Sequence, residues 1–266
     1  MGERLKNKVA IVIGAGQQPG DTIGNGRAIS ILFAREGAKV MLVDKNIDSA
    51  QETKAMIDKE GNESFAFKAD IVREDDCRQI IEKCIDLYGR IDILVNNVGT
   101  GTGDNNLVRM SEDIWDKIIN TNLKGMFFTC KYVLPVMEKQ ESGSIINISS
   151  IAAICSTALA VYKISKSGVN ALTHQLALKY AEKGIRVNAI MPGLMNTPMA
   201  IEGRSKATGR SKEEVIKYRN NMVPLKGGMG DAWDTAYAAL FLSSDEAKFI
   251  TSVILPVDGG QSSRRG

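Results

Sequence analysis

The chain has 266 residues, of which 44% are hydrophobic and 24% are charged, and its formal net charge is +3. This composition is typical of a globular protein, and so small and scattered a charge argues against a nucleic-acid partner. No apolar run approaches the roughly 20 residues of a membrane span, no apolar leader is visible, and the four cysteines lie too far apart for a disulfide frame or a zinc site, so we expect a cytoplasmic protein without a membrane anchor.

Short apolar segments alternate with longer helical patterns along the whole chain. Strands are predicted at residues 9–13, 39–43, 64–68, 91–95, 144–148, 186–190 and 252–256. Helices are predicted at residues 26–36, 48–60, 74–88, 112–139, 161–182 and 231–242. At four junctions a glycine follows the helix directly, as expected of a helix C-terminal cap, and these glycines are Gly37, Gly61, Gly89 and Gly184.

The alternation of strands and helices predicts β-α-β units and therefore a parallel sheet. The strands are almost continuously apolar, which is typical of a sheet with helices on both faces. We therefore predict an α/β fold of the Rossmann type, with a doubly wound, mostly parallel seven-stranded sheet. Because no linker or change in composition divides the chain, we expect a single domain over residues 1–266. Residues 196–212 are predicted to be irregular, and we expect a substrate loop around 194–222.

A glycine-rich loop follows the first predicted strand. Glycines such as Gly14 let backbone N–H groups approach a pyrophosphate, which then lies at the positive N-terminus of the next helix. We expect that helix to start at about Gly24, because a start further upstream would place glycines inside its first turns. Residues 17–22 should then form a bulge over the pyrophosphate, with Thr22 and Ile23 meeting the phosphates. The alternative is a surface excursion that never touches the cofactor.

Asp44 ends the second predicted strand, about twenty residues after Gly24. A carboxylate at this point can accept hydrogen bonds from both ribose hydroxyls of an adenosine, and it would repel a 2′-phosphate. This favours NAD over NADP as the cofactor, although the neighbouring Lys45 could accommodate a phosphate. Asp70, after the third predicted strand, could hydrogen-bond the adenine amino group or could cap a turn.

Tyr162 and Lys166 are four residues apart in a predicted helix, and Tyr162 lies twelve residues after Ser150. At this spacing the two side chains share one face of the helix. An ammonium beside a phenol favours the phenolate and lowers the phenol pKa from about 10. Such a tyrosine can exchange a proton with an alcohol or a carbonyl near neutral pH. A hydroxyl of the Ser149-Ser150 pair could hold the same substrate oxygen.

Together these features resemble the short-chain dehydrogenase/reductase family, and the similarity spans nearly the whole chain. The motifs that carry it are the glycine-rich loop, Asp44, Asp70-Ile71, Asn96-Asn97-Val98-Gly99, Asn122, Ser149-Ser150, Tyr162-x-x-x-Lys166, Pro192-Gly193 with Thr197, and Val257-Asp258-Gly259-Gly260. The resemblance implies an oxidoreductase that acts on a secondary alcohol or ketone with NAD as cofactor, and it implies a homotetramer.

The resemblance also implies roles for individual residues. Ser150 would orient the substrate oxygen, Tyr162 would be the general acid and base, and Lys166 would lower the pKa of Tyr162 and hold the nicotinamide ribose. Asn122 would hold a water that links Lys166 to solvent. Cofactor contacts are implied for Gly14, Thr22, Ile23, Gly24, Asp44, Asp70, Ile71, Asn97, Gly99, Tyr162, Lys166, Pro192, Met195 and Thr197.

Three features depart from the pattern of the family that the chain resembles. The cofactor loop carries about six extra residues, as in the divergent enoyl reductases, although those space their tyrosine and lysine further apart. Val98 stands where the family usually has alanine. The spacing to Tyr162 matches Ser149, whereas the position in the motif matches Ser150. We predict that Ser150 is the catalytic serine, because strand position fixes where a side chain points, and Ser149 is the alternative.

The sequence therefore predicts an NAD-dependent alcohol dehydrogenase or ketoreductase. An enoyl reductase and a nucleotide-binding regulator without turnover are the alternatives. The single histidine, His174, argues against a Ser-His-Asp triad and against a multi-histidine metal site, and we predict no metal. We interpret His174 as a packed or interface residue rather than a proton relay.

Overall fold

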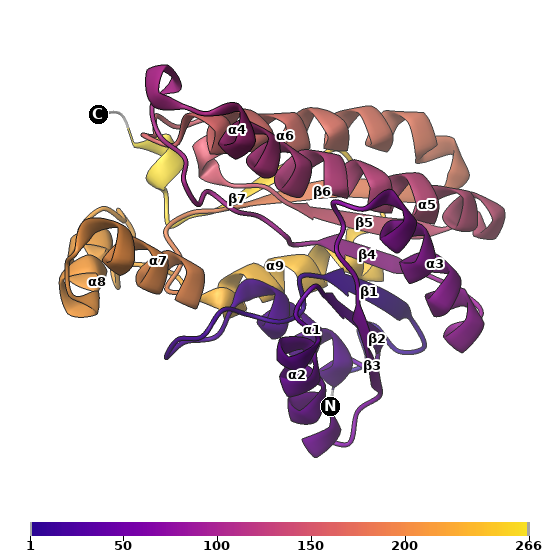
Figure 1. Ribbon diagram of the computed structural model, residues 1–266. Coiled ribbons are helices and arrows are strands. Elements are labelled where there is room, and N and C mark those ends of the chain that lie inside the picture. The colour runs from indigo at the N-terminus through magenta and orange to yellow at the C-terminus, as the bar shows by residue number, and fades with distance from the viewer. Residues whose placement is uncertain (1, 265–266) are drawn as a thin grey trace.

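A computed structural model describes residues 2–264, and seven parallel strands form one sheet at its centre (Figure 1). The strands are β1 (Val9–Ile13), β2 (Lys39–Asp44), β3 (Ser64–Lys68), β4 (Ile93–Asn96), β5 (Gly143–Ile148), β6 (Ile185–Pro192) and β7 (Ile254–Val257). Their order is β3-β2-β1-β4-β5-β6-β7, so the winding reverses between β1 and β4. Ligands of doubly wound folds bind at this point, beyond the carboxyl ends of the strands. The predicted Rossmann-type fold is confirmed, and every strand pairing is parallel.

Helices cover both faces of the sheet (Figure 1). They are α1 (Asn25–Arg35), α2 (Ile47–Lys59), α3 (Glu74–Tyr88), α4 (Glu112–Ile119), α5 (Gly125–Gln140), α6 (Ala160–Tyr180), α7 (Pro198–Thr208), α8 (Lys212–Asn220) and α9 (Ala232–Ser243). In β1, Ala10 and Val12 face the core shared with α1, α2 and α9. The alternate residues Val9 and Ile11 face the core shared with α3, α5 and α6. Because successive side chains of a strand point to opposite faces of the sheet, β1 contributes to the apolar core on each face.

The single helix predicted at 112–139 is interrupted in the structure. A π-helical turn, Asn120–Lys124, separates α4 from α5. The side chain of Asn122 points inward there and bonds to the segment after β4. Such a π-turn is often found at functional sites. The apolar pattern continues through this region, so no feature of the sequence indicates the break.

The prediction of an irregular stretch at 196–212 was wrong. Residues 194–222, which we call the α7–α8 segment, contain two helices that stand to one side of the sheet (Figure 1). Pro198 occupies the first turn of α7, and Gly209 caps its end with φ of +69°. Ser211 and Glu214 form a capping box at the start of α8. Only a few residues of these helices are buried, so the apolar periodicity that marks other helices is missing.

The four helix-ending glycines all adopt a positive φ. Within residues 2–264 there is no helix with the length and apolar character needed to cross a membrane. In the same residues no three His, Cys, Asp or Glu side chains converge on a point that could hold a metal ion. All four cysteines are free thiols. His174 lies on the surface, with its Nδ1 2.7 Å from the hydroxyl of Ser252.

Candidate active site

The polar residues singled out from the sequence gather at one edge of the sheet. Gly14 follows β1, Asp44 ends β2, Asn97 follows β4, and Ser149-Ser150 follow β5. Because the strands are parallel, their carboxyl ends lie along the same edge. The first turns of α6 lie over this edge and carry Tyr162 and Lys166. The structure therefore assembles one continuous site from segments that are far apart in the sequence.

Lys166 is deeply buried beside Tyr162. Its Nζ lies 5.7 Å from the centroid of the Tyr162 ring and donates a hydrogen bond of 2.8 Å to the carbonyl of Ile148. The residue is only 2% exposed. Gly99 leaves space for the ammonium, since a Cβ on that residue would stand 3.1 Å from Nζ. A larger residue at position 99 would displace the lysine.

Burial governs the acid–base properties of this pair. Desolvation lowers the pKa of Lys166 from 10.5 to about 7, because an ammonium without nearby water is costly. Desolvation also raises the pKa of Tyr162 above its ordinary 10, and hydrogen bonding to Ser150 offsets only part of that rise. The net shift of the Tyr162 pKa is thus upward, and a lowering of that pKa by Lys166 stays a prediction. The Lys166 ammonium is directed at the Ile148 carbonyl and is itself desolvated.

The two serines after β5 point in different directions, as neighbouring residues on an extended backbone must. Ser149 is buried, and its hydroxyl donates a 3.1 Å hydrogen bond to the carbonyl of Lys166. The hydroxyl of Ser150 accepts from the N–H of Ala152 at 3.1 Å and interacts with the phenol of Tyr162. Of the pair, it is Ser150 that the structure brings to Tyr162.

Asn122 connects the segment after β4 to α6. Its Nδ2 donates to the carbonyl of Thr100 at 2.9 Å and to the hydroxyl of Ser165 at 3.0 Å, and its Oδ1 accepts from the N–H of Thr100 at 2.7 Å. The Ser165 hydroxyl in turn donates to the carbonyl of Tyr162 at 2.7 Å. Both side-chain N–H groups of Asn122 are thus in use. A water held by this residue would have to donate to its Oδ1, which keeps a second lone pair, or to its backbone carbonyl.

The N-terminus of α1 meets the glycine-rich loop as predicted. Gly24 is the N-cap, so the expected helix start is confirmed. A Cβ on Gly26 would clash with the carbonyl oxygen of Gly14, so glycine is required for this close approach. Across residues 2–264 we find no acceptor for the N–H groups of the first three helical residues, 25–27. Free N–H groups and the positive end of the helix dipole suit an anion such as a pyrophosphate.

The inserted residues 17–22 form an ordered loop. The side-chain oxygen of Gln17 accepts from the N–H of Gly24 at 2.9 Å, and its Nε2 donates to the carbonyl of Thr22 at 3.3 Å. One glutamine therefore closes the loop onto the start of α1. Thr22 and Ile23 are partly exposed at the edge of the site. Their contact with a pyrophosphate stays a prediction.

Asp44 and Asn97 lie at the carboxyl ends of β2 and β4, close to the glycine-rich loop. Asp44 Oδ2 accepts from the N–H of Gly16 at 3.0 Å, and Oδ1 accepts from the N–H of Asn46 at 2.9 Å. Each carboxylate oxygen keeps one lone pair for a further donor. Asn97 donates to the carbonyl of Gly14 at 3.0 Å, which fixes the loop that follows β1.

Asp70 and Ile71 follow β3, and both have structural contacts. The Asp70 carboxylate accepts from the N–H of Val72 at 3.3 Å, which is the turn-capping role considered as an alternative. Ile71 is buried, and its side chain packs where a Cβ on Gly125 would be. Their contacts with a cofactor are likewise untested predictions.

Three predicted cofactor residues lie at the end of β6 and at the beginning of the α7–α8 segment. Pro192 ends β6, Met195 forms a bridge with Gly230, and Thr197 is the N-cap of α7. Met195 and Thr197 are both buried. The Thr197 side chain makes no capping hydrogen bond, so its hydroxyl is available to another partner.

Sequence reasoning missed Asp104. Its carboxylate accepts from the N–H of Tyr162 at 2.7 Å and from the N–H of Val161 at 3.3 Å. The N-cap residue of α6, Leu159, has no capping side chain, so a loop from elsewhere in the chain supplies the cap. A cap that comes from a distant loop leaves no local signature in the sequence.

A buried polar network beneath the site was also missed. Asn96 donates to Asn147 at 2.9 Å across β4 and β5. Thr129 of α5 donates to Asn96 at 2.7 Å, and Asn147 donates to Thr173 of α6 at 3.0 Å. Satisfied networks of this kind rigidify a core. These hydrogen bonds fix β4 to α5 and β5 to α6.

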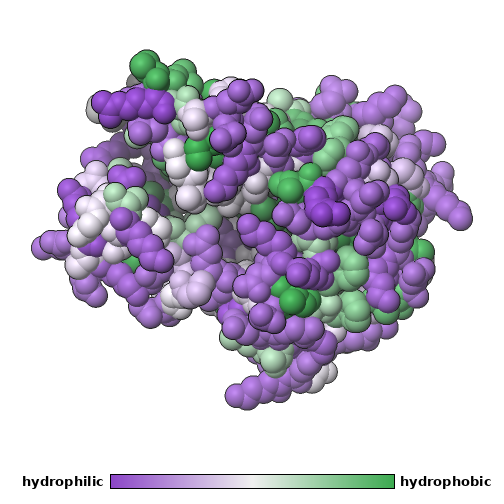
Figure 2. All heavy atoms as spheres, viewed as in Figure 1, coloured by the Kyte–Doolittle hydropathy of each residue, from purple (hydrophilic) through white to green (hydrophobic). Residues whose placement is uncertain are grey.

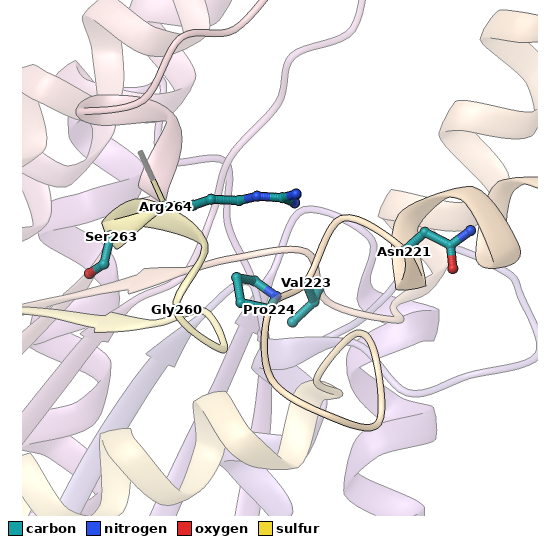
Figure 3. A pocket seen from close by; sticks show the side chains of 6 residues that line it. All are labelled: Asn221, Val223, Pro224, Gly260, Ser263 and Arg264. Atoms are coloured by element: carbon teal, nitrogen blue, oxygen red, sulfur yellow. The ribbon is translucent and has the colours of Figure 1, made fainter. Parts of the chain in front are cut away.

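The α7–α8 segment forms a lobe, and a hollow separates it from the rest of the molecule (Figure 2). A cavity of about 450 Å³ lies between the residues that follow α8 and those that follow β7. The side chain of Arg264 extends above Pro224 and Val223 in the direction of Asn221 (Figure 3). A second cavity of about 490 Å³ lies at the amino ends of β4, β5 and β6, on the opposite edge from the site. Ligands of this fold bind at the carboxyl edge.

Comparison with known proteins shows which family has this arrangement. The sequence model of the family described as Enoyl-(Acyl carrier protein) reductase matches residues 21–262. The 3-oxoacyl-(acyl-carrier-protein) reductase FabG of Thermotoga maritima is 37% identical over 262 residues, which cover 97% of this chain and 98% of that protein. A protein from Burkholderia xenovorans, assigned to the short-chain dehydrogenases/reductases, has a crystal structure that superimposes with a TM-score of 0.91 and 38% identity over the full length of both chains.

A further solved structure contains a cofactor. It is carveol dehydrogenase from Mycobacterium avium in complex with NAD, with a TM-score of 0.90, 26% identity, and coverage of 98% of this chain and 100% of that one. The family model and the curated relative both extend over nearly the whole sequence. The chain therefore belongs to the short-chain dehydrogenase/reductase family.

Proposed function

We propose that this chain is an NAD-dependent oxidoreductase that transfers a hydride between the cofactor and a secondary alcohol or ketone. The observation that carries the proposal is the convergence of Ser150, Tyr162 and Lys166 at the carboxyl edge of the sheet. The free N-terminus of α1 supports a bound pyrophosphate at the same edge. The described residues, 2–264, are proposed to form a single domain, and the α7–α8 segment is proposed to be its substrate loop.

Tyr162 is proposed as the proton donor and acceptor. In reduction its phenol gives a proton to the carbonyl oxygen of the substrate, and in oxidation it takes the proton back from the alcohol. Burial raises its pKa, so the phenol carries its proton at neutral pH, which suits reduction. Ser150 orients the reacting oxygen by a hydrogen bond. General acid–base catalysis of this kind contributes roughly 10²–10⁴-fold to the rate.

Lys166 is proposed to hold the nicotinamide ribose and to exchange protons with Tyr162. A pKa of about 7 allows both of its protonation states near neutral pH. Gly99 keeps the space beside its ammonium open. The cofactor, when bound, supplies or accepts the hydride at its nicotinamide ring, and the chain supplies position and proton transfer.

NAD is proposed as the preferred cofactor because of Asp44. Its two free lone pairs suit ribose hydroxyls, whereas a 2′-phosphate would meet a second negative charge. The related carveol dehydrogenase was solved with NAD, which supports the choice. We expect kcat/KM to be at least tenfold higher with NAD, since about 1.4 kcal/mol gives a factor of ten. Equal values, or a preference for NADP, would indicate that Lys45 rather than Asp44 determines the choice.

The alcohol or ketone class is supported by the relatives. One is a reductase of 3-oxoacyl groups and another is a dehydrogenase of carveol, so both act on a C–O group by name. The matching family model is described as an enoyl reductase, which keeps that reaction as the second candidate. The short spacing between Tyr162 and Lys166 disfavours it. A panel of ketones, secondary alcohols and enoyl thioesters, followed by NADH absorbance, separates the two, and no turnover of any substrate would favour a regulator.

A homotetramer is proposed as the working assembly. Large apolar side chains remain exposed on α4, α5 and α6, at Trp115, Phe127 and Ile164, and Phe249 before β7 is 100% exposed. Apolar surfaces of this kind mark interfaces between protein chains. Light scattering on the purified protein tests the assembly. The free thiols support the proposed cytoplasmic location.

A further inference from the structure

The inserted loop of the cofactor site touches the α7–α8 segment through one lysine. Lys212, the first residue of α8, has its Nζ 3.0 Å from Asp21 Oδ2 and 2.6 Å from Glu202 Oε1. Asp21 belongs to the insertion 17–22, and it lies 191 residues before Lys212 in the sequence. Glu202 lies in α7. A single ammonium therefore joins the cofactor side of the site to the substrate side, and we call this contact the Asp21–Lys212–Glu202 bridge.

Close packing accompanies the bridge. A Cβ on Gly20 would stand only 2.8 Å from the Cβ of Pro198 and 3.2 Å from the Cγ of Glu202. Pro198 begins α7 directly after Thr197, one of the predicted cofactor residues. The insertion thus rests against the turn where the α7–α8 segment enters the site. Its lack of a side chain at position 20 allows this approach.

The insertion is hydrogen-bonded to the start of α1. Gln17 bonds both to the carbonyl of Thr22 and to the N–H of Gly24, the N-cap of α1. The loop therefore links the bridge at its tip to the helix N-terminus at its base. A displacement of Asp21 would therefore shift the N-terminus of α1, where the pyrophosphate is proposed to bind.

The strength of the bridge is suited to a contact that opens and closes. The side chain of Asp21 is 82% exposed and that of Glu202 is 18% exposed. The hydrogen bonds that Lys212 donates to Glu202 and, second, to Asp21 raise the pKa of its ammonium, which stays charged at neutral pH. Ion pairs at the surface contribute little to stability and are weakened by salt. They can still favour one of two arrangements of a surface segment.

We propose that Lys212 is a positioning residue for the cofactor, which fastens the inserted loop to the α7–α8 segment so that both close together over the bound dinucleotide. The inference rests on the proposed function, because it requires a pyrophosphate at the N-terminus of α1. Release of the cofactor then requires the bridge to open. Breaking the bridge should speed release and weaken cofactor binding, while leaving the proton-transfer residues untouched.

Three variants separate the parts of the bridge. Asp21→Asn removes only the charge that pairs Lys212 with the insertion, Glu202→Gln removes only the charge that pairs it with α7, and Lys212→Met removes both ion pairs and both hydrogen bonds. Lys217→Met is the matched control, since this exposed lysine of α8 forms no ion pair among the described residues. The measurement is the dissociation rate of NADH by stopped-flow fluorescence, together with its Kd, at low and high salt.

At low salt we expect Asp21→Asn and Lys212→Met each to raise the NADH dissociation rate three- to tenfold. The double variant Asp21→Asn/Lys212→Met should dissociate NADH little faster than either single variant, because both substitutions break the same contact. High salt should bring the wild type close to these variants, while Lys217→Met should follow the wild type throughout. Glu202→Gln should have a smaller effect than Asp21→Asn. Wild-type release rates in Asp21→Asn and Lys212→Met, or effects that add fully, would overturn this inference alone. A wild-type protein that binds no nicotinamide cofactor would overturn the proposed function and the inference with it.

Discussion

The Asp104 carboxylate accepts a hydrogen bond of 2.7 Å from the backbone N–H of Tyr162, although 58 residues separate the two in the sequence. This contact determines where α6 begins and therefore where the phenol lies. The same loop contributes Thr100, which is bonded to Asn122. The segment after β4 is thus attached to the proposed acid–base residue at two points.

Asp104→Ala should lower kcat by about 10- to 100-fold with little change in the Kd of NADH, because a displacement of about 1 Å at a reacting group can cost 10²-fold. Asp104→Asn should recover most of the activity, since an amide oxygen can accept the same hydrogen bond. The control is Asp231→Ala, which removes a side-chain cap from α9 instead. A wild-type kcat in Asp104→Ala, or an equal loss in Asp231→Ala, would contradict the positioning role.

The two serines after β5 should respond differently to replacement by alanine. Ser150→Ala should lower kcat strongly, because its hydroxyl is the one beside Tyr162. Ser149→Ala removes a buried hydrogen bond to the carbonyl of Lys166. It should therefore destabilise the protein by about 1 kcal/mol and affect turnover less. Steady-state kinetics and thermal unfolding of both variants test the contrast, and the reverse order in kcat would favour Ser149.

Lys166 should make the protein less stable at neutral pH than at alkaline pH. Its pKa falls from 10.5 to about 7 on folding, so between these values the unfolded chain binds more protons than the folded one. The penalty is complete below about pH 7 and disappears as the pH rises toward 10.5. At about 1.4 kcal/mol per pKa unit, its upper bound is about 5 kcal/mol.

Lys166→Met removes this penalty, although it also leaves the Ile148 carbonyl without its donor. The free energy of unfolding of the variant, relative to the wild type, should therefore be highest near pH 7 and should fall toward pH 10. Urea unfolding at several pH values measures the trend, with the exposed Lys179→Met as control. A difference that does not vary with pH would show that Lys166 is not desolvated as described.

The fold was predictable from the sequence because its determinants are local. The apolar segments around Ile11 and Ile146 are buried strands, and helices that end at glycines such as Gly89 precede the next strand. The same reasoning failed for α7 and α8, where only Pro198, Ile201 and Val215 are buried. The caps of these helices were visible in the sequence, whereas the apolar stripe that usually confirms a helix was absent.

The candidate site was predictable to the extent that its residues belong to recognisable motifs. The motifs named Tyr162, Lys166 and Asn122, and the structure brings the first two together. The cap from Asp104 and the bonds of Asn122 depend on which loops meet in three dimensions, so no spacing along the chain indicates them. The desolvation that raises the pKa of Tyr162 is likewise a property of the folded environment, so no motif indicates it.

The central claim is that the hydroxyl of Tyr162 transfers the proton. Tyr162→Phe removes that hydroxyl and keeps the ring, and Tyr180→Phe removes a hydroxyl from the other end of α6 as a control. The measurement is kcat on the best ketone substrate together with the Kd of NADH for each variant. We expect Tyr162→Phe to lose at least about 100-fold in kcat, within the range for general acid–base catalysis, with a Kd within about twofold of the wild type. Near-normal turnover in Tyr162→Phe would contradict the mechanism.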